Sequence, residues 1–196
     1  MTQISTTPII KAIHFAAHKH RQQRRKDPDQ TPYINHPIEL LKLLANDVGI
    51  VDPVVLVGAI LHDTVEDTAT TLTEIDAIFG SEVATVVSQL TDDKSLPQAT
   101  RKQLQIDHAA QLSDRAKLVK LADKIANVRD IASAPPPDWP LARCLAYCDW
   151  GKRVVDQLRG IYPYLESLFD QAYGQAYNQL TNRPADESVK GSPSGR

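Results

Sequence analysis

The stretch Val54-Val-Leu-Val-Gly-Ala-Ile-Leu-His-Asp-Thr-Val-Glu-Asp67 joins an apolar run directly to a cluster of ionisable groups. Its first part, up to Leu61, is apolar on every side, which predicts a buried helix rather than a surface helix. Imidazole and carboxylate groups in a dry interior are costly unless they are paired or coordinate a cation. The end of this core helix, at His62 and Asp63, is therefore a candidate metal site.

The spacing within this stretch also places polar groups on shared faces. On a helix, His62 lies over Glu66 and Asp63 lies over Asp67, because residues four apart stack on one face. A His-Asp pair alone is more typical of a helix end with its cap than of a metal site. The metal interpretation therefore depends on ligands from elsewhere in the chain.

Two distant residues can complete such a site. His36 lies between an asparagine and a proline at an expected helix start, and Asp123 is a polar residue within an apolar-periodic helix. With His62 and Asp63 they make two imidazoles and two carboxylates, a ligand set that suits divalent ions such as Mn²⁺, Fe²⁺ or Zn²⁺. We expect the ion to keep open positions for water and substrate.

The remaining chain has the period of α-helices. Apolar residues mostly recur at intervals of three and four, and we find no alternating strand pattern. Thr71 and Glu74 have capping-box spacing, and Gly80 is typical of a joint between two helices. We predict helices at residues 104–112, 116–132 and 141–180, and loops at 90–99 and 133–140.

Length and composition indicate one globular domain. The chain has 196 residues, of which 42% are hydrophobic and 23% charged. We predict an all-α fold, a single bundle of about eight to ten helices around the metal site, spanning residues 8–180. Residues 1–7 are expected to be flexible, and residues 181–196 to form a disordered tail.

Charge limits the classes of partner. The net charge of −2 and pI near 6.3 disfavour a general nucleic-acid binder. The charges are nevertheless segregated: Lys19 to Lys26 holds five basic residues in eight, either a phosphate-binding segment or a solvated helix end. Arg25 could stack on a nucleobase, and Asn127 lies one turn beyond Asp123, where it could offer an amide to substrate.

The sequence also indicates a cytoplasmic protein. Its longest apolar run is far shorter than the roughly 20 residues that span a bilayer, and no secretory leader is evident. Cys144 and Cys148 are spaced like neighbouring buried thiols rather than a disulfide framework, which favours a reducing compartment.

We expect a small-molecule nucleotide as partner, without nucleic acid or membrane. The oligomeric state stays open.

Five ordered motifs stand out along the chain. They are Ala17-His-Lys-His-Arg-Gln-Gln-Arg-Arg-Lys-Asp-Pro28, Thr31-Pro-Tyr-Ile-Asn-His-Pro37, Leu61-His-Asp-Thr-Val-Glu-Asp-Thr68, Thr91-Asp-Asp-Lys94, and Ala116-Lys-Leu-Val-Lys-Leu-Ala-Asp-Lys124 with Asn127 and Arg129. Together they closely resemble HD-domain hydrolases of the RelA/SpoT type, specifically the small stand-alone alarmone hydrolases of the metazoan SpoT-homologue type. The resemblance covers about residues 8–160, and five spaced motifs are far more specific than one His-Asp pair.

The resemblance implies an all-helical enzyme that removes the 3′-pyrophosphate from guanosine tetra- and pentaphosphate, usually with Mn²⁺, to give GDP or GTP and pyrophosphate. It implies the metal ligands His36, His62, Asp63 and Asp123, and the catalytic acidic pair Glu66 and Asp67. Around the nucleotide or its phosphates it implies Arg25, Lys26, Tyr33, Asn127 and Arg129, with Arg143 and Tyr147 facing the substrate. This chain has Gln98 where a close relative has lysine, which puts one phosphate contact in doubt.

Other functions fit the same residues. The site could remove the 2′-phosphate of NADPH or act on another nucleotide. A non-catalytic nucleotide sensor would need a degenerate metal site, which the complete ligand set and the Glu66-Asp67 pair argue against. Nucleic-acid binding through Lys19 to Lys26 would show a steep dependence on salt concentration.

Overall fold

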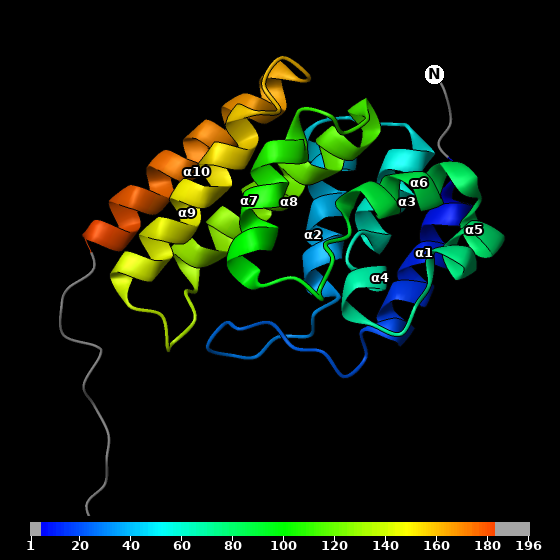
Figure 1. The fold of residues 1–196 in the computed structure, drawn as a ribbon, viewed down its shortest axis with the longest axis horizontal. Helices are drawn as coiled ribbons and strands as arrows, with labels where there is room; N and C mark the ends of the chain where they lie inside the picture. Colours follow the sequence, from blue (N-terminus) through cyan, green and yellow to red (C-terminus); the bar gives the residue numbers. More distant parts are fainter. Residues whose placement is uncertain (1–4, 183–196) are drawn as a thin grey trace, which may run out of the picture.

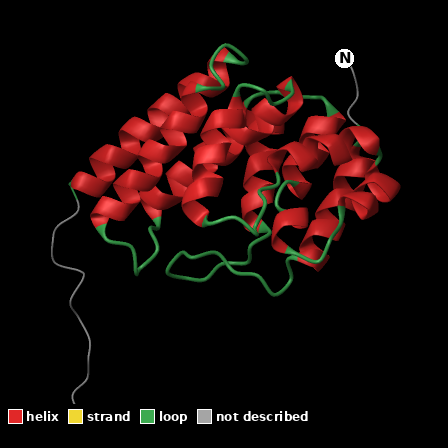
Figure 2. Cartoon of the chain, viewed as in Figure 1, coloured by secondary structure: helices red, strands yellow, loops and turns green. Residues whose placement is uncertain are grey.

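The computed structural model describes residues 5–182 and is built from helices joined by loops (Figure 2). Within these residues there are ten α-helices and one π-helical segment, and the only extended pairing is an isolated bridge between Arg24 and Pro32. The elements are α1 (Thr6–Lys19), α2 (Asn35–Lys42), η1 (Leu43–Asp47), α3 (Pro53–Leu61), α4 (Thr64–Asp67), α5 (Leu72–Phe79), α6 (Ser81–Leu90), α7 (Gln98–Ala109), α8 (Asp114–Ser133), α9 (Leu141–Asp156) and α10 (Pro163–Thr181). The predicted all-α fold is confirmed.

Helix α3 is the buried helix that the apolar run predicts. Asp52 caps its start by accepting a hydrogen bond from the Val54 backbone N–H at 2.9 Å, and Pro53 occupies the first turn. Every residue from Val55 to Leu61 is buried. Helices α1, α2, α6 and α8 pack around it, so the end of α3 delivers His62 into the protein interior.

Helix α8 runs through the middle of the molecule and connects its two halves (Figure 1). On one side it contacts α2, α3 and α6, and on the other α9 and α10, which lie side by side at one end of the molecule. Because α8 is covered from several directions, most of its residues are buried, including Asp123 and Lys124. Charged groups on this helix therefore need partners inside the fold.

The joints follow the expected chemistry. Gly49 and Gly80 have φ angles of +81° and +90°, in the region that favours glycine, and Gly80 separates α5 from α6. Thr71 accepts a hydrogen bond from the Glu74 backbone N–H at 3.1 Å, which is half of the predicted capping box. The Glu74 carboxylate instead pairs with Lys19 on α1 at 2.8 Å, so the other half is replaced by a contact between helices.

Three expectations need correction. Helix α7 begins at Gln98, directly after Pro97, and ends at Ala109; its first turns are polar and therefore lack the apolar period that marked 104–112. The helix through His62 and Glu66 is not continuous, because the chain turns at His62 and Asp63 before α4 begins. Helix α1 begins at Thr6, inside the stretch expected to be flexible. Residues 1–4 and 183–196 lie outside the described part of the chain.

Two further features bear on the sequence interpretation. Cys144 and Cys148 are both buried thiols on α9, as their spacing predicts. Within residues 5–182, no helix combines the length and the apolar character needed to cross a membrane.

The close packing of α3 against α6 can be tested at Gly58. A Cβ atom at this position would lie 2.9 Å from Cγ1 of Val86, whose χ1 is restricted in a helix. Gly58→Ala should therefore lower the free energy of unfolding by about 1–3 kcal/mol in urea titrations, although alanine has the higher helix propensity.

Gly174→Ala on α10 is the matched control, because a Cβ there meets nothing within 4 Å. That variant should be neutral or gain up to about 1 kcal/mol. Equal stability changes in the two variants would contradict the proposed clash.

Candidate metal centre

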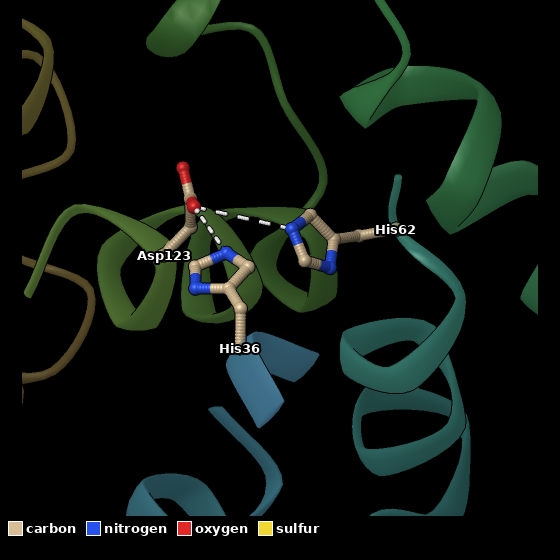
Figure 3. Close-up of side chains that lie close together, drawn as sticks. All are labelled: His36, His62 and Asp123. Atoms are coloured by element: carbon tan, nitrogen blue, oxygen red, sulfur yellow. Dashed lines mark ion pairs between the residues drawn. The ribbon is translucent and has the colours of Figure 1, made fainter. Parts of the chain in front are cut away.

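Three separate helical elements bring two imidazoles and a carboxylate together (Figure 3). His36 comes from the first turn of α2, His62 follows the last residue of α3, and Asp123 comes from the middle of α8. One ligand atom from each lies within 4.8 Å of the other two, and all three residues are buried. The Nε2 atoms of His36 and His62 are 3.2 and 3.9 Å from Oδ1 of Asp123.

The hydrogen bonds of His62 define which ring nitrogen faces the cluster. Its Nδ1 lies 2.8 Å from the carbonyl oxygen of Ala59, and a carbonyl can only accept, so Nδ1 carries the proton in the neutral ring. Nε2 of the neutral ring then presents a lone pair, and this buried atom makes no well-aligned hydrogen bond in the described structure. This arrangement is typical of a histidine prepared for a metal ion.

Asp63, the fourth predicted ligand, lies against the same nitrogen. Its Oδ2 is 2.9 Å from Nε2 of His62 and accepts a hydrogen bond from the hydroxyl of Tyr33. Asp63 is not a member of the compact group formed by His36, His62 and Asp123, but it borders that group through His62. Two carboxylates thus face one imidazole lone pair, and a cation between them removes the repulsion.

The pKa directions show how strongly these groups interact. Burial lowers the pKa of His62, but the carboxylates of Asp63 and Asp123 outweigh it and raise that pKa to about 9. Burial also opposes ionisation of Asp63, yet the neighbouring His62 keeps its pKa below the ordinary value. For Asp123, Lys124 and His36 overcome burial and lower the pKa. The pocket therefore favours positive charge among ionised carboxylates, which is either a proton on Nε2 of His62 or a metal ion that replaces this proton.

The predicted acidic pair lies one turn after the cluster, on α4. Glu66 accepts a hydrogen bond from the Asp92 backbone N–H at 3.0 Å, and Arg101 lies 3.7 Å from its carboxylate. Asp67 accepts from Gln23 at 2.9 Å and forms an ion pair with Lys94. Burial, together with nearby carboxylates, raises the pKa of Glu66. A carboxylate with a raised pKa is a better proton acceptor near neutral pH.

The residues expected around the nucleotide divide into two groups. In the first, Arg25 pairs with Asp130 and lies over the ring of Tyr33 at 5.8 Å. Asn127 donates to Oδ1 of Asp123 at 2.5 Å, so here its amide orients a candidate ligand. Lys26 is exposed and Arg129 is half-buried on α8.

The second group lies on and before α9. The guanidinium of Arg143 stacks on Trp139 at 4.3 Å, and the Tyr147 ring packs 5.5 Å from Trp139. Lys102 of α7 lies 5.1 Å from the centroid of Tyr147. Aromatic faces next to cations are suited to stack a base and to attract phosphate. Gln98, at the start of α7, is exposed.

Several residues of this site were not assigned roles from the sequence. They are Gln23, Asp92, Lys94, Arg101, Gln105 and Lys124. Gln23, Asp92, Lys94 and Lys124 lie inside the motifs quoted above, so membership in a motif was a usable signal. Arg101 and Gln105 lie outside every motif, and polar residues on a helix surface carry no such signal.

Comparisons with known proteins agree with this architecture. The HD domain family matches residues 12–144. A pyrophosphohydrolase from Xenopus tropicalis, guanosine-3′,5′-bis(diphosphate) 3′-pyrophosphohydrolase MESH1, is 50% identical over 165 residues, which cover 84% of this chain and 92% of the relative. The chain belongs to the HD-domain family and, within it, to the MESH1 group of small pyrophosphohydrolase homologues.

Two further relatives support this assignment. The human protein of the same name is 49% identical over 167 residues, covering 85% of this chain and 93% of the relative. A solved structure of a metazoan orthologue of SpoT that hydrolyses ppGpp superposes with a TM-score of 0.85 at 44% identity, covering 89% of this chain and 98% of that one. The family expected from the motifs is confirmed.

Metal binding can be measured through thermal unfolding. Addition of MnCl₂ at about 100 times its dissociation constant should stabilise the wild-type protein by about 2.7 kcal/mol, because the ion binds only the folded state. His62→Ala should show no such rise in Tm, since it removes the nitrogen that faces both carboxylates.

His108→Ala is the control, because it removes an exposed imidazole on α7 outside the cluster. The same metal-induced rise in all three proteins would rule out the assigned cluster.

Proposed function

We propose that this protein is a metal-dependent hydrolase that removes the 3′-pyrophosphate from ppGpp and pppGpp, giving GDP or GTP and pyrophosphate, with Mn²⁺ as its ion. The observation that carries the proposal is the placement of the Glu66-Asp67 pair one turn after a buried cluster of imidazoles and carboxylates. The names of relatives at about 50% identity support the substrate.

The ligand set fits a divalent cation. His36, His62, Asp63 and Asp123 would hold it, and Nε2 of His62, buried between the carboxylates of Asp63 and Asp123, would offer it a lone pair. When bound, such an ion lowers the pKa of a water molecule and withdraws charge from a phosphoryl oxygen. Asn127 and Lys124 hold the two oxygens of Asp123, and Tyr33 holds Asp63, so the carboxylates are oriented before any ion arrives.

Glu66 is the proposed proton acceptor. The hydrogen bond from the Asp92 backbone holds its carboxylate in one orientation, and the raised pKa of Glu66 makes that carboxylate a better proton acceptor. Glu66 takes a proton from the attacking water, and Asp67 helps to orient that water. The water oxygen bonds to the phosphorus attached to the 3′-oxygen, and the bond from that phosphorus to the 3′-oxygen breaks. The 3′-oxygen takes up a proton from solvent water, pyrophosphate leaves, and Glu66 returns its proton to solvent.

Cations around the acidic pair suit a highly anionic substrate. Lys94 and Arg101 lie beside Glu66 and Asp67, while Arg25 lies across Tyr33. These groups offset the negative charge that the phosphates bring to an acidic pocket. We propose that Arg25, Lys26, Tyr33, Asn127, Arg129, Arg143 and Tyr147 surround the nucleotide, with Trp139 adding an aromatic face.

The reaction is tested by identifying the phosphate released from a panel of nucleotides. Metal-loaded protein should release pyrophosphate from ppGpp and pppGpp, seen by ³¹P NMR together with GDP or GTP. Orthophosphate from NADPH at a higher kcat/KM would make the 2′-phosphatase activity the principal one. Tight binding of ppGpp without any release would instead favour the nucleotide sensor.

Separate variants distinguish proton transfer from metal retention. Glu66→Gln keeps the cluster intact and should retain the metal-induced rise in Tm while losing about 10²- to 10⁴-fold in kcat. Asp63→Ala should lose turnover and weaken metal retention, because it removes a carboxylate next to Nε2 of His62.

Glu82→Gln serves as the control, since this carboxylate is exposed on α6 and pairs with Arg115. It should keep wild-type kcat. If Glu66→Gln also hydrolyses ppGpp at the wild-type rate, Glu66 is not the proton acceptor.

A further inference from the structure

One side chain of α7, Gln105, contacts both halves of the site. Its Nε2 donates to Oδ2 of Asp92 at 2.8 Å, and its Oε1 accepts from Nζ of Lys124 at 3.1 Å. A carboxylate can only accept and an ammonium can only donate, so the two neighbours fix the orientation of the amide. Neither leucine nor an ionised glutamate at this position could serve both partners.

The two neighbours of Gln105 each hold one functional carboxylate. The backbone N–H of Asp92 donates to Oε2 of Glu66 at 3.0 Å, and Nζ of Lys124 donates to Oδ2 of Asp123 at 3.0 Å. Glu66 is therefore connected to Asp123 through Asp92, Gln105 and Lys124, by hydrogen bonds to the backbone and to the carboxylate of Asp92 and by those of Gln105 and Lys124. In sequence these two carboxylates belong to separate helices, α4 and α8.

The Lys124 end of this path is buried, which strengthens its contacts. The side chain of Lys124 is only 4% exposed, and its ammonium lies 4.2 Å from the ring centroid of Trp150. Loss of the Gln105 oxygen would leave this buried ammonium with one hydrogen-bond partner fewer. On the other side, Arg101 lies 3.8 Å from the Asp92 carboxylate and 3.7 Å from Glu66, which ties the two acids together.

We propose that Gln105 is a positioning residue that sets the placement of the proton acceptor Glu66 relative to the metal ligand Asp123. This inference rests on the proposed function. Gln105 acts through Asp92 and Lys124 and not by touching substrate. Small displacements between a proton acceptor and its reaction centre cost rate, so a residue that joins the two supports affects kcat more than KM.

The sharpest test exchanges the carboxylate at position 92 with the amide at position 105. Gln105→Glu places a carboxylate 2.8 Å from that of Asp92, and should lower kcat for ppGpp at least tenfold with less than a threefold change in KM. Adding Asp92→Asn supplies an amide donor to the new carboxylate, which still accepts from Lys124. The double variant should recover at least fivefold in kcat, which a role in packing alone would not produce.

A spectroscopic readout is independent of substrate. The visible absorption spectrum of the Co²⁺-loaded protein reports the surroundings of the ion. It should change in Gln105→Glu, because the new carboxylate draws Lys124 away from Asp123, and should return towards wild type in the double variant. Gln103→Glu is the matched control, since Gln103 is exposed on the same helix and hydrogen-bonds to Asp107. It should match wild type in kcat and spectrum.

The outcomes separate this inference from the proposed function. Wild-type rate and spectrum in Gln105→Glu would overturn the positioning role, and so would a loss that the double variant fails to recover. If the wild-type protein binds Co²⁺ but does not hydrolyse ppGpp, the proposed function fails, and the Co²⁺ spectra alone decide the role of Gln105.

Discussion

Two carboxylates facing the lone pair of one buried imidazole form the constraint on which the rest of the site depends. The carbonyl of Ala59 accepts a hydrogen bond from Nδ1–H of His62, so Nε2 of the neutral ring faces Asp63 and Asp123 with a lone pair. Like-charged acceptors in a dry interior repel unless a cation lies between them. The fold supports this arrangement because α2, α3 and α8 pack against one another. Lys124 and Asn127 also donate hydrogen bonds to the carboxylate of Asp123.

The near-neutral net charge conceals how charge is used. Acidic side chains gather at the cluster and on α4, and cations from other segments border them: Arg25 from the loop before α2, Lys94 from the loop before α7, and Arg101 from α7. An acidic pocket alone would repel a polyphosphate, whereas a basic one would not retain a divalent ion. The alternation of both signs is what a metal-dependent phosphohydrolase needs, and it agrees with the HD-domain family of the chain.

Much of this was predictable from sequence because it depends on local patterns. The apolar run to Leu61 predicted a buried helix, and the helical period predicted the all-α fold. The meeting of His36 with His62 and Asp123 was proposed from residue chemistry and resemblance, and the structure brings the three together. The turn after Leu61 and the contacts of Gln105 could not be predicted, since they depend on how α7 packs against its neighbours rather than on any local pattern. Which of these residues act in catalysis stays a prediction.

The metal site is the central claim, and anomalous X-ray diffraction from crystals soaked in MnCl₂ tests it most directly. The account predicts one strong anomalous peak in the space bordered by His36, His62, Asp63 and Asp123, with His62 still bonded through Nδ1 to the carbonyl of Ala59. A peak elsewhere, or none at this position in crystals that hold Mn²⁺, would contradict it.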